Sequence, residues 1–149
     1  MKLGEGDMRK VLNILQSTAL AYSISSDPSG RNDERVLTIE DIYMCTGAPM
    51  PADIEQMVGW MLSDDLTSAF NKIYDLKTLK GIALQDILTE VHKYIERIDF
   101  PPNVRIYLLR ELADLECRLA VGTNEKLQLG SLVAVFYNAR NKVKEEAAE

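Results

Sequence analysis

The sequence between residues 82 and 98 reads IALQDILTEVHKYIERI, and its apolar side chains follow the period of an α-helix. They recur at spacings of three and four, at Leu84, Ile87, Leu88, Val91, Tyr94, Ile95 and Ile98. This spacing gathers them on one face of a helix, and no strand-like alternation competes with it. The stretch therefore predicts an amphipathic helix over 82–98, whose apolar face is expected to pack against other helices.

Helical patterns continue on both sides of this stretch. Pro51 is suited to the first position of a helix, and Asp64 and Asp65 introduce another that ends at Gly81. The apolar positions expected to be buried in these two are Ile54, Met57, Val58, Met61, Leu62, Leu66, Ala69, Phe70, Ile73, Leu76 and Leu79. After Phe100–Pro102 a helix is expected to run to about Val121, and the last one carries Leu127, Leu129, Leu132, Val133, Val135, Phe136, Ala139 and Val143.

The N-terminal part predicts two more helices. Asp7 is a good N-cap for a helix over 8–22, whose apolar stripe is Val11, Leu12, Leu15 and Ala19. Residues 25–35 are polar and rich in turn formers, so we expect an exposed, mobile loop. Thr38 with Asp41 has the form of a capping box, opening a short helix that stops at Gly47. Pro49 and Pro51 follow at once, which makes this joint the preferred domain boundary.

The sequence thus predicts an all-α protein of about seven helices. Its last two helices are apolar over more surface than one core contact needs, at positions such as Ile106, Leu109, Ala113 and Ala120. Such additional apolar surface is covered either by several other helices of the same chain or by another subunit. Arg110, Asp114 and Arg118 are spaced four apart, so a charge ladder can cover the remaining face.

Composition excludes several classes of function. The net charge of −6 repels duplex DNA, and the small basic cluster of Lys72, Lys77 and Lys80 is interpreted as a solvated face. A single histidine, His92, excludes a multi-histidine zinc site or a His-based triad, and no phosphate-binding Gly-x-x-x-x-Gly-Lys-Ser/Thr loop is present. Cys45 and Cys117 lie far apart in the sequence and neither belongs to a Cys-x-x-Cys pair, so we expect both to be reduced. No apolar run is long enough to span a bilayer, so a soluble, intracellular protein is expected.

Arg9 is the candidate functional residue. It lies one turn into a helix, where the positive end of the helix dipole disfavours a cation by a few tenths of a kcal/mol. A helix N-terminus carrying an arginine is also a plausible place for a bound anion such as phosphate. Position alone favours the simpler interpretation, in which Arg9 points into water.

Two sets of motifs resemble a known family. Residues 6–9, Gly-Asp-Met-Arg, followed by Val-Leu-Asn-Ile-Leu-Gln at 11–16, resemble the second sensor motif of AAA+ ATPases. Residues 113–119, Ala-Asp-Leu-Glu-Cys-Arg-Leu, and 122–129, Gly-Thr-Asn-Glu-Lys-Leu-Gln-Leu, resemble the closing signature of replication factor C small subunits, which belong to the clamp loader.

The resemblance implies that residues 1–47 are the end of an AAA+ lid and residues 48–149 a five-helix collar. It implies that Arg9 contacts the terminal phosphate of ATP in the full-length protein, which would use ATP and Mg²⁺, whereas this fragment would hold no cofactor and catalyse nothing by itself. The collar would assemble with other replication factor C subunits in the nucleus. The sliding clamp and primer–template DNA would be reached through the missing ATPase module, no membrane would be involved, and self-association of the isolated fragment is plausible.

Two alternatives stay open at this point. The chain could be the regulatory end of a different AAA+ machine, or a helical adaptor in which the match around Arg9 arose by chance. Upstream sequence and the effect of Arg9→Ala on ATP turnover separate them.

Overall fold

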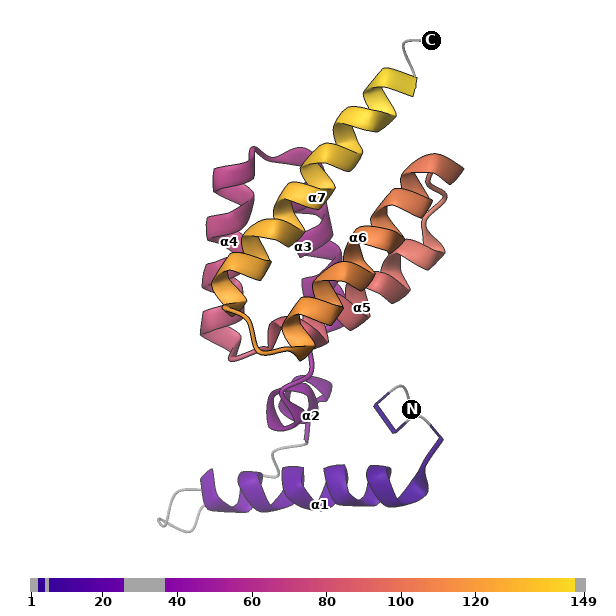
Figure 1. The fold of residues 1–149 in the computed structure, drawn as a ribbon. Coiled ribbons are helices and arrows are strands. Elements are labelled where there is room, and N and C mark those ends of the chain that lie inside the picture. Colours follow the sequence, from indigo (N-terminus) through magenta and orange to yellow (C-terminus); the bar gives the residue numbers. More distant parts are fainter. Residues whose placement is uncertain (1–2, 5, 26–36, 147–149) are drawn as a thin grey trace. The chain divides into compact units, whose positions relative to one another are not determined.

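The structure is a computed structural model that describes residues 3–4, 6–25 and 37–146. Within these ranges it contains seven α-helices and no strand, which confirms the all-α prediction. Their bounds are α1 Met8–Ser25, α2 Ile39–Thr46, α3 Pro51–Ser63, α4 Leu66–Lys80, α5 Leu84–Arg97, α6 Pro102–Ala120 and α7 Glu125–Glu146 (Figure 1). Ser25 belongs to α1, and the rest of the loop predicted over 25–35 lies outside the described residues.

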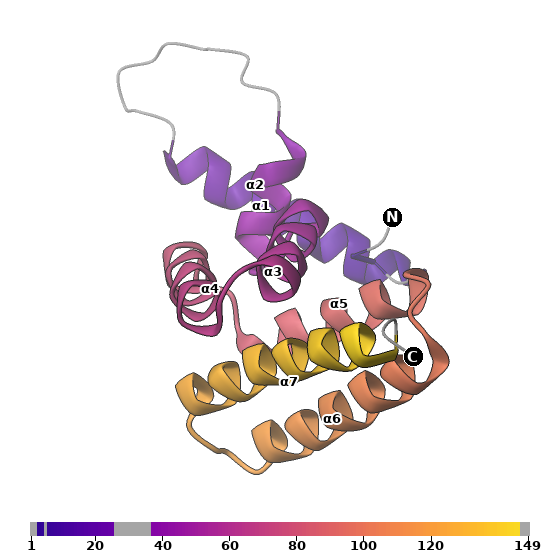
Figure 2. The ribbon, with the colours of Figure 1, turned by 90° about the horizontal axis from the view of Figure 1, so that it is seen from above.

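The chain divides into two compact units, residues 1–48 and residues 49–149. In the first unit α2 packs against α1. In the second, α3 to α7 form a bundle in which α7 contacts α3, α4 and α6. Figure 2 shows α6 and α7 side by side along one edge of this bundle. None of the helices in the described part of the chain is both long and apolar enough to cross a lipid bilayer.

Local sequence signals set the helix ends. Thr38 and Asp41 form the predicted capping box, and Asp65 caps α4 by accepting from the Ser68 N–H. Gly47 and Gly81 end α2 and α4 in the left-handed conformation, with φ of 67° and 64°, which glycine adopts without a steric penalty. These boundaries confirm the predictions made from the same residues.

The core of the bundle is the apolar stripe of each helix. Met57, Ile73, Ile87 and Leu108 are buried completely, and so is Phe136 of α7. The quoted stretch of α5 buries Leu84, Ile87, Leu88, Val91 and Ile95, as its period predicts. Each such side chain contributes roughly 1.5–3 kcal/mol by leaving water, so packing rather than helix propensity stabilises the bundle.

Some residues of the predicted apolar stripes are exposed. Leu66 and Leu79 were expected to be buried, yet they are 41% and 84% exposed. Leu12 and Leu15, on the predicted stripe of α1, are exposed as well. In each case the helical period is right, but period alone does not say whether a neighbour covers the stripe.

The lysine cluster, interpreted as a solvated face, is exposed at Lys72 and Lys80 and half-buried at Lys77, and it also forms ion pairs. Each of the three lysines forms an ion pair with a different carboxylate: Lys72 with Asp64, Lys77 with Glu125, and Lys80 with Asp53. The Lys80 Nζ lies 2.7 and 2.6 Å from the two oxygens of Asp53, a buried carboxylate of α3. The cluster therefore joins α4 to its neighbours, because a buried carboxylate needs a cation nearby.

Glu125, the first residue of α7, joins three helices through one carboxylate. Its Oε2 accepts from Lys77 Nζ in α4 at 2.9 Å, and its Oε1 accepts from the backbone N–H of Leu84, the first residue of α5, at 2.6 Å. The N-cap position of α5 is Ala83, which offers no side-chain cap. Glu125 therefore supplies from a distant part of the sequence the acceptor that α5 lacks at its own start.

Arg140, near the other end of α7, forms hydrogen bonds with the turn between α3 and α4. Its Nη1 donates to the carbonyl oxygens of Leu62 at 3.3 Å and Asp64 at 2.9 Å. Carbonyls at a helix C-terminus have no partner within their own helix. Glu125 and Arg140 thus fix α7 at two points to the ends of other helices.

Replacing Glu125 with alanine should lower the free energy of unfolding of the bundle by about 1–2 kcal/mol, because it removes a helix cap and a charged hydrogen bond together. Urea unfolding followed by circular dichroism measures this. The matched control is Glu90→Ala, which removes an exposed pair with Lys93 and should cost under about 0.5 kcal/mol. Equal losses in the two variants would contradict the role given to Glu125.

Stability should depend on pH through the same carboxylate. Burial raises the pKa of Glu125, but hydrogen bonds from Lys77 and the Leu84 N–H outweigh it, so its pKa lies below the ordinary value of 4.5. A carboxyl whose folded pKa is depressed stabilises the fold above its unfolded pKa and loses that contribution as the pH falls through the folded value. We expect the difference in unfolding free energy between the wild type and Glu125→Gln to be constant above pH 4.5 and to shrink below it. A difference that grows on acidification would contradict this.

Candidate functional site

The start of α1 is shaped by Asp7. Its Oδ1 accepts from the backbone N–H of Arg9 at 2.8 Å, and its own N–H donates to the carbonyl of Gly4 at 2.7 Å. Asp7 therefore caps α1 as predicted and satisfies one of the free donors of the first turn.

Arg9 and Lys10 occupy the first turn of α1, which contains no acidic residue. Both side chains are exposed. Arg9 and Lys10 thus bring two cationic side chains to the N-terminal turn of α1, beside the Asp7 carboxylate.

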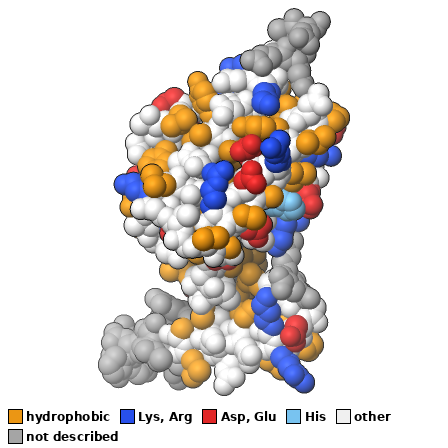
Figure 3. Space-filling model, viewed as in Figure 1, with side chains coloured by type: hydrophobic (Ala, Val, Ile, Leu, Met, Phe, Trp, Pro, Cys, Tyr) orange, Lys and Arg blue, Asp and Glu red, His pale blue; other side chains and the backbone are white. Residues whose placement is uncertain are grey.

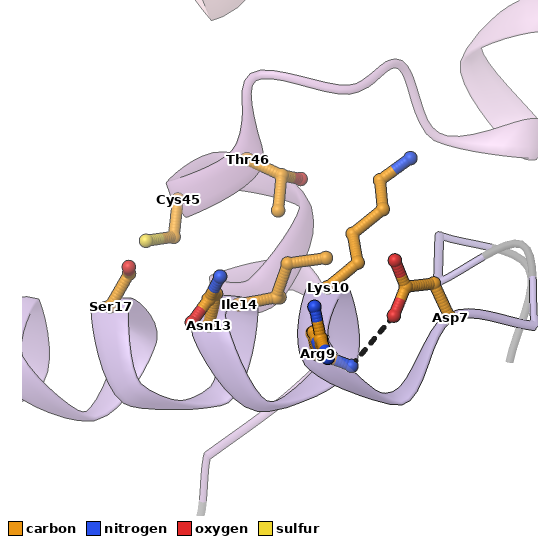
Figure 4. Close-up of a pocket in the computed structure, with 8 residues that line it drawn as sticks. All are labelled: Asp7, Arg9, Lys10, Asn13, Ile14, Ser17, Cys45 and Thr46. Carbon is orange, nitrogen blue, oxygen red and sulfur yellow. Dashed lines mark hydrogen bonds between the residues drawn. The ribbon is translucent and has the colours of Figure 1, made fainter.

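A shallow pocket of about 400 Å³ lies beside these residues, between α1 and the end of α2. Its lining from α1 and the preceding turn is Asp7, Arg9, Lys10, Asn13, Ile14 and Ser17, and its lining from α2 is Cys45 and Thr46. Figure 4 shows Ile14, Ser17 and Lys10 rising from α1 on the side where Cys45 and Thr46 lie. The pocket belongs entirely to the first unit.

The lining is suited to binding an anionic group. It combines two cations with the amide of Asn13 and the hydroxyl of Ser17, all able to donate hydrogen bonds. The Thr46 hydroxyl is already engaged, because it donates to the carbonyls of Ile42 and Tyr43 at 2.9 and 3.1 Å. A helix N-terminus with flanking cations is a common setting for phosphate.

The described residues offer no constellation for metal binding, since none of their His, Cys, Asp and Glu side chains form a group of three. Cys45 and Cys117 are free, as predicted, and both are exposed; His92 is an exposed residue of α5. The candidate chemistry of this unit is recognition of an anion by Arg9 and Lys10, because both line the pocket.

Sequence reasoning singled out Arg9 but did not identify Cys45 and Thr46 as lining the same pocket. Cys45 and Thr46 reach the pocket because α2 packs against α1, and their positions carried no local signal for that contact. Both ends of α2, at Thr38 and at Gly47, were predictable, but not its contact with α1.

The sequence of the second unit matches a known protein family. Residues 49–135 match the model described as "Replication factor C C-terminal domain". This range begins just before α3 and ends inside α7, so it includes four helices of the bundle entirely and part of the fifth.

Individual relatives extend the similarity to nearly the whole chain. The chain is 50% identical over 145 residues to replication factor C subunit 5 of Homo sapiens, covering 97% of this chain and 39% of the relative. It is 45% identical over 140 residues to subunit 3 of Oryza sativa, covering 94% and 36%. It is 32% identical over 143 residues to subunit 3 of Saccharomyces cerevisiae, covering 93% and 40%. The chain thus spans about two fifths of the length of these relatives.

Proposed function

Because this chain belongs to the replication factor C family, we propose that it is the C-terminal part of a clamp-loader subunit and holds that subunit in a ring of sibling subunits. The proposal rests chiefly on the family match over residues 49–135. In the complete complex, ATP-driven loading of the sliding clamp onto primer–template DNA would be carried out by ATPase modules outside this chain. Such a complex works in DNA replication, so the protein would act in the nucleus.

Residues 48–149 would form the collar and residues 1–47 the end of the ATPase lid. The bundle suits a structural role, because its helix ends are tied to one another by Glu125, Arg140 and Lys80. An interface that persists through cycles of ATP binding needs a surface that keeps its shape. Ion pairs and caps within the bundle support such a surface.

Arg9 would contact the terminal phosphate of ATP in the full-length protein, where Mg²⁺ accompanies the nucleotide. Its place in the first turn of α1, beside Lys10 and an open pocket, supports this role. The fragment alone would be non-catalytic, since the residues that polarise and hydrolyse the nucleotide would lie in the missing module.

Assembly tests the first part of the proposal. The 149-residue chain, co-expressed with the other replication factor C subunits, should copurify with at least one of them, and native mass spectrometry should show the complex. The control is Phe136→Asp, which places a charge in the core and should abolish copurification by unfolding the bundle. A well-folded wild-type chain that binds no sibling would refute the assembly role.

ATP turnover tests the role of Arg9. In the full-length subunit, Arg9→Ala should reduce the ATPase rate of the assembled complex by about tenfold or more, because a cation on the transferred phosphate stabilises the transition state. The matched control is Gln16→Ala, an exposed residue of the same helix outside the pocket. The complex should assemble normally in both variants. Unchanged turnover in Arg9→Ala would remove the assignment.

A further inference from the structure

The first unit, residues 1–48, has no hydrophobic core of its own. Every buried hydrophobic side chain in the described part of the chain lies between Ile54 and Ala139, in the second unit. α2 buries none of its side chains, and the one side chain that α1 buries, among its residues whose exposure is described, is that of Thr18. A unit this small needs apolar burial to offset the entropy that folding costs.

One face of α1 is apolar and exposed over several turns. It consists of Met8, Leu12, Leu15 and Ala19, and the three larger side chains are 63%, 58% and 51% exposed. At 100° per residue the four lie within about 60° of one another around the helix axis. Their spacings of four, three and four residues are those of a seam along which a second helix packs lengthwise. The stripe is therefore continuous and suited to a helical partner.

This stripe faces away from the pocket at the start of α1. Lys10, Asn13, Ile14 and Ser17 line the pocket, and their mean direction around the helix axis is about 180° from that of the stripe. Figure 4 shows Lys10, Ile14 and Ser17 on the side of α1 where α2 ends. A helix packed on the stripe would therefore leave these pocket residues uncovered.

The extent of the family match indicates where the partner of α1 lies. The match to the replication factor C C-terminal domain begins at residue 49, which is also where the second unit begins. The similarity to the human relative covers 97% of this chain, so it includes the first unit, yet it covers only 39% of that relative. The first unit is therefore outside the matched domain, and the relative has enough further sequence to complete it.

We propose that the stripe of Met8, Leu12, Leu15 and Ala19 is the docking surface for an amphipathic helix from the residues that precede this chain in the full-length subunit. The inference rests on the proposed function, which makes the chain the C-terminal part of a longer polypeptide. α1 and α2 are then the second half of a helical domain, and the docked helix supplies the core that they lack. In the 149-residue chain alone the first unit is marginally stable, whereas the bundle has its own core.

Amide hydrogen exchange, measured by mass spectrometry, tests this docking. The amides of α1 should exchange about tenfold or more slowly in the free full-length subunit than in the 149-residue chain, because the docked helix stabilises α1. The double variant Leu12→Gln with Leu15→Gln should remove this protection in the full-length subunit and leave exchange in the 149-residue chain unchanged. Glutamine forms helices nearly as well as leucine, so the variant tests docking rather than helix propensity.

The matched control is Leu20→Gln, because Leu20 is 56% exposed on the same helix and lies about 110° away from the stripe. This variant should keep the protection of α1, and the amides of α3 to α7 serve as an internal reference for folding. Equal exchange of α1 in the two wild-type proteins overturns the proposal. So does exchange in the 149-residue chain that slows with concentration, as a second copy would cause, or protection that appears only after sibling subunits are added.

The exchange experiment and the copurification experiment fail independently. Copurification depends on sibling subunits, whereas exchange in the free full-length subunit involves one polypeptide and reports on α1. A chain that binds its siblings but has an unprotected α1 retains the assembly role and loses the docked helix. A protected α1 without copurification retains the docked helix and loses the assembly role.

Discussion

The bundle depends on a general constraint: the polar groups at the end of a helix have no partner within that helix and must find one elsewhere. α5 begins at Leu84 behind an alanine that cannot cap it, and α3 ends with carbonyls directed at a turn. α7 supplies both missing partners: Glu125 at its start accepts from the first N–H of α5, and Arg140 near its end donates to the carbonyls at the end of α3. Five amphipathic stripes could pack in several arrangements. These two side chains favour the one in which α7 lies against α3 and α4.

The same contacts explain what sequence could predict and what it could not. Helix ends at Thr38, Gly47 and Gly81 were predictable because capping residues act within four positions of the end they stabilise. The pairing of Lys77 with Glu125 joins residues 48 positions apart, and a local pattern holds no information about it. Leu79 was misplaced for a related reason, since a helical period locates a stripe but does not identify the helix that covers it. In the candidate site, the capping of α1 by Asp7 followed from its sequence, whereas the contribution of Cys45 and Thr46 followed only from packing.

Electrostatics in this chain is distributed unevenly. The net charge is −6, yet the three lysines of α4 form ion pairs with carboxylates of the bundle, and Arg9 and Lys10 line a pocket at the start of α1. The face of the molecule seen in Figure 3 carries charges of both signs with hydrophobic side chains between them. Overall charge is therefore a poor guide to what any one surface of the protein attracts.

The order of the helices has a consequence for biosynthesis. α7 is translated after α3 to α6, and the ribosome releases a chain from its N-terminus onward. Until Glu125 and Arg140 have emerged, α5 lacks its acceptor, the turn after α3 lacks its donor, and the pocket that receives Phe136 stands open. The nascent bundle would expose apolar surface during that interval, which makes it a client for chaperones that bind such surfaces. A premature stop only a few codons into α7 would thus leave the cell with an unfinished bundle, even though most of its core residues had already been made.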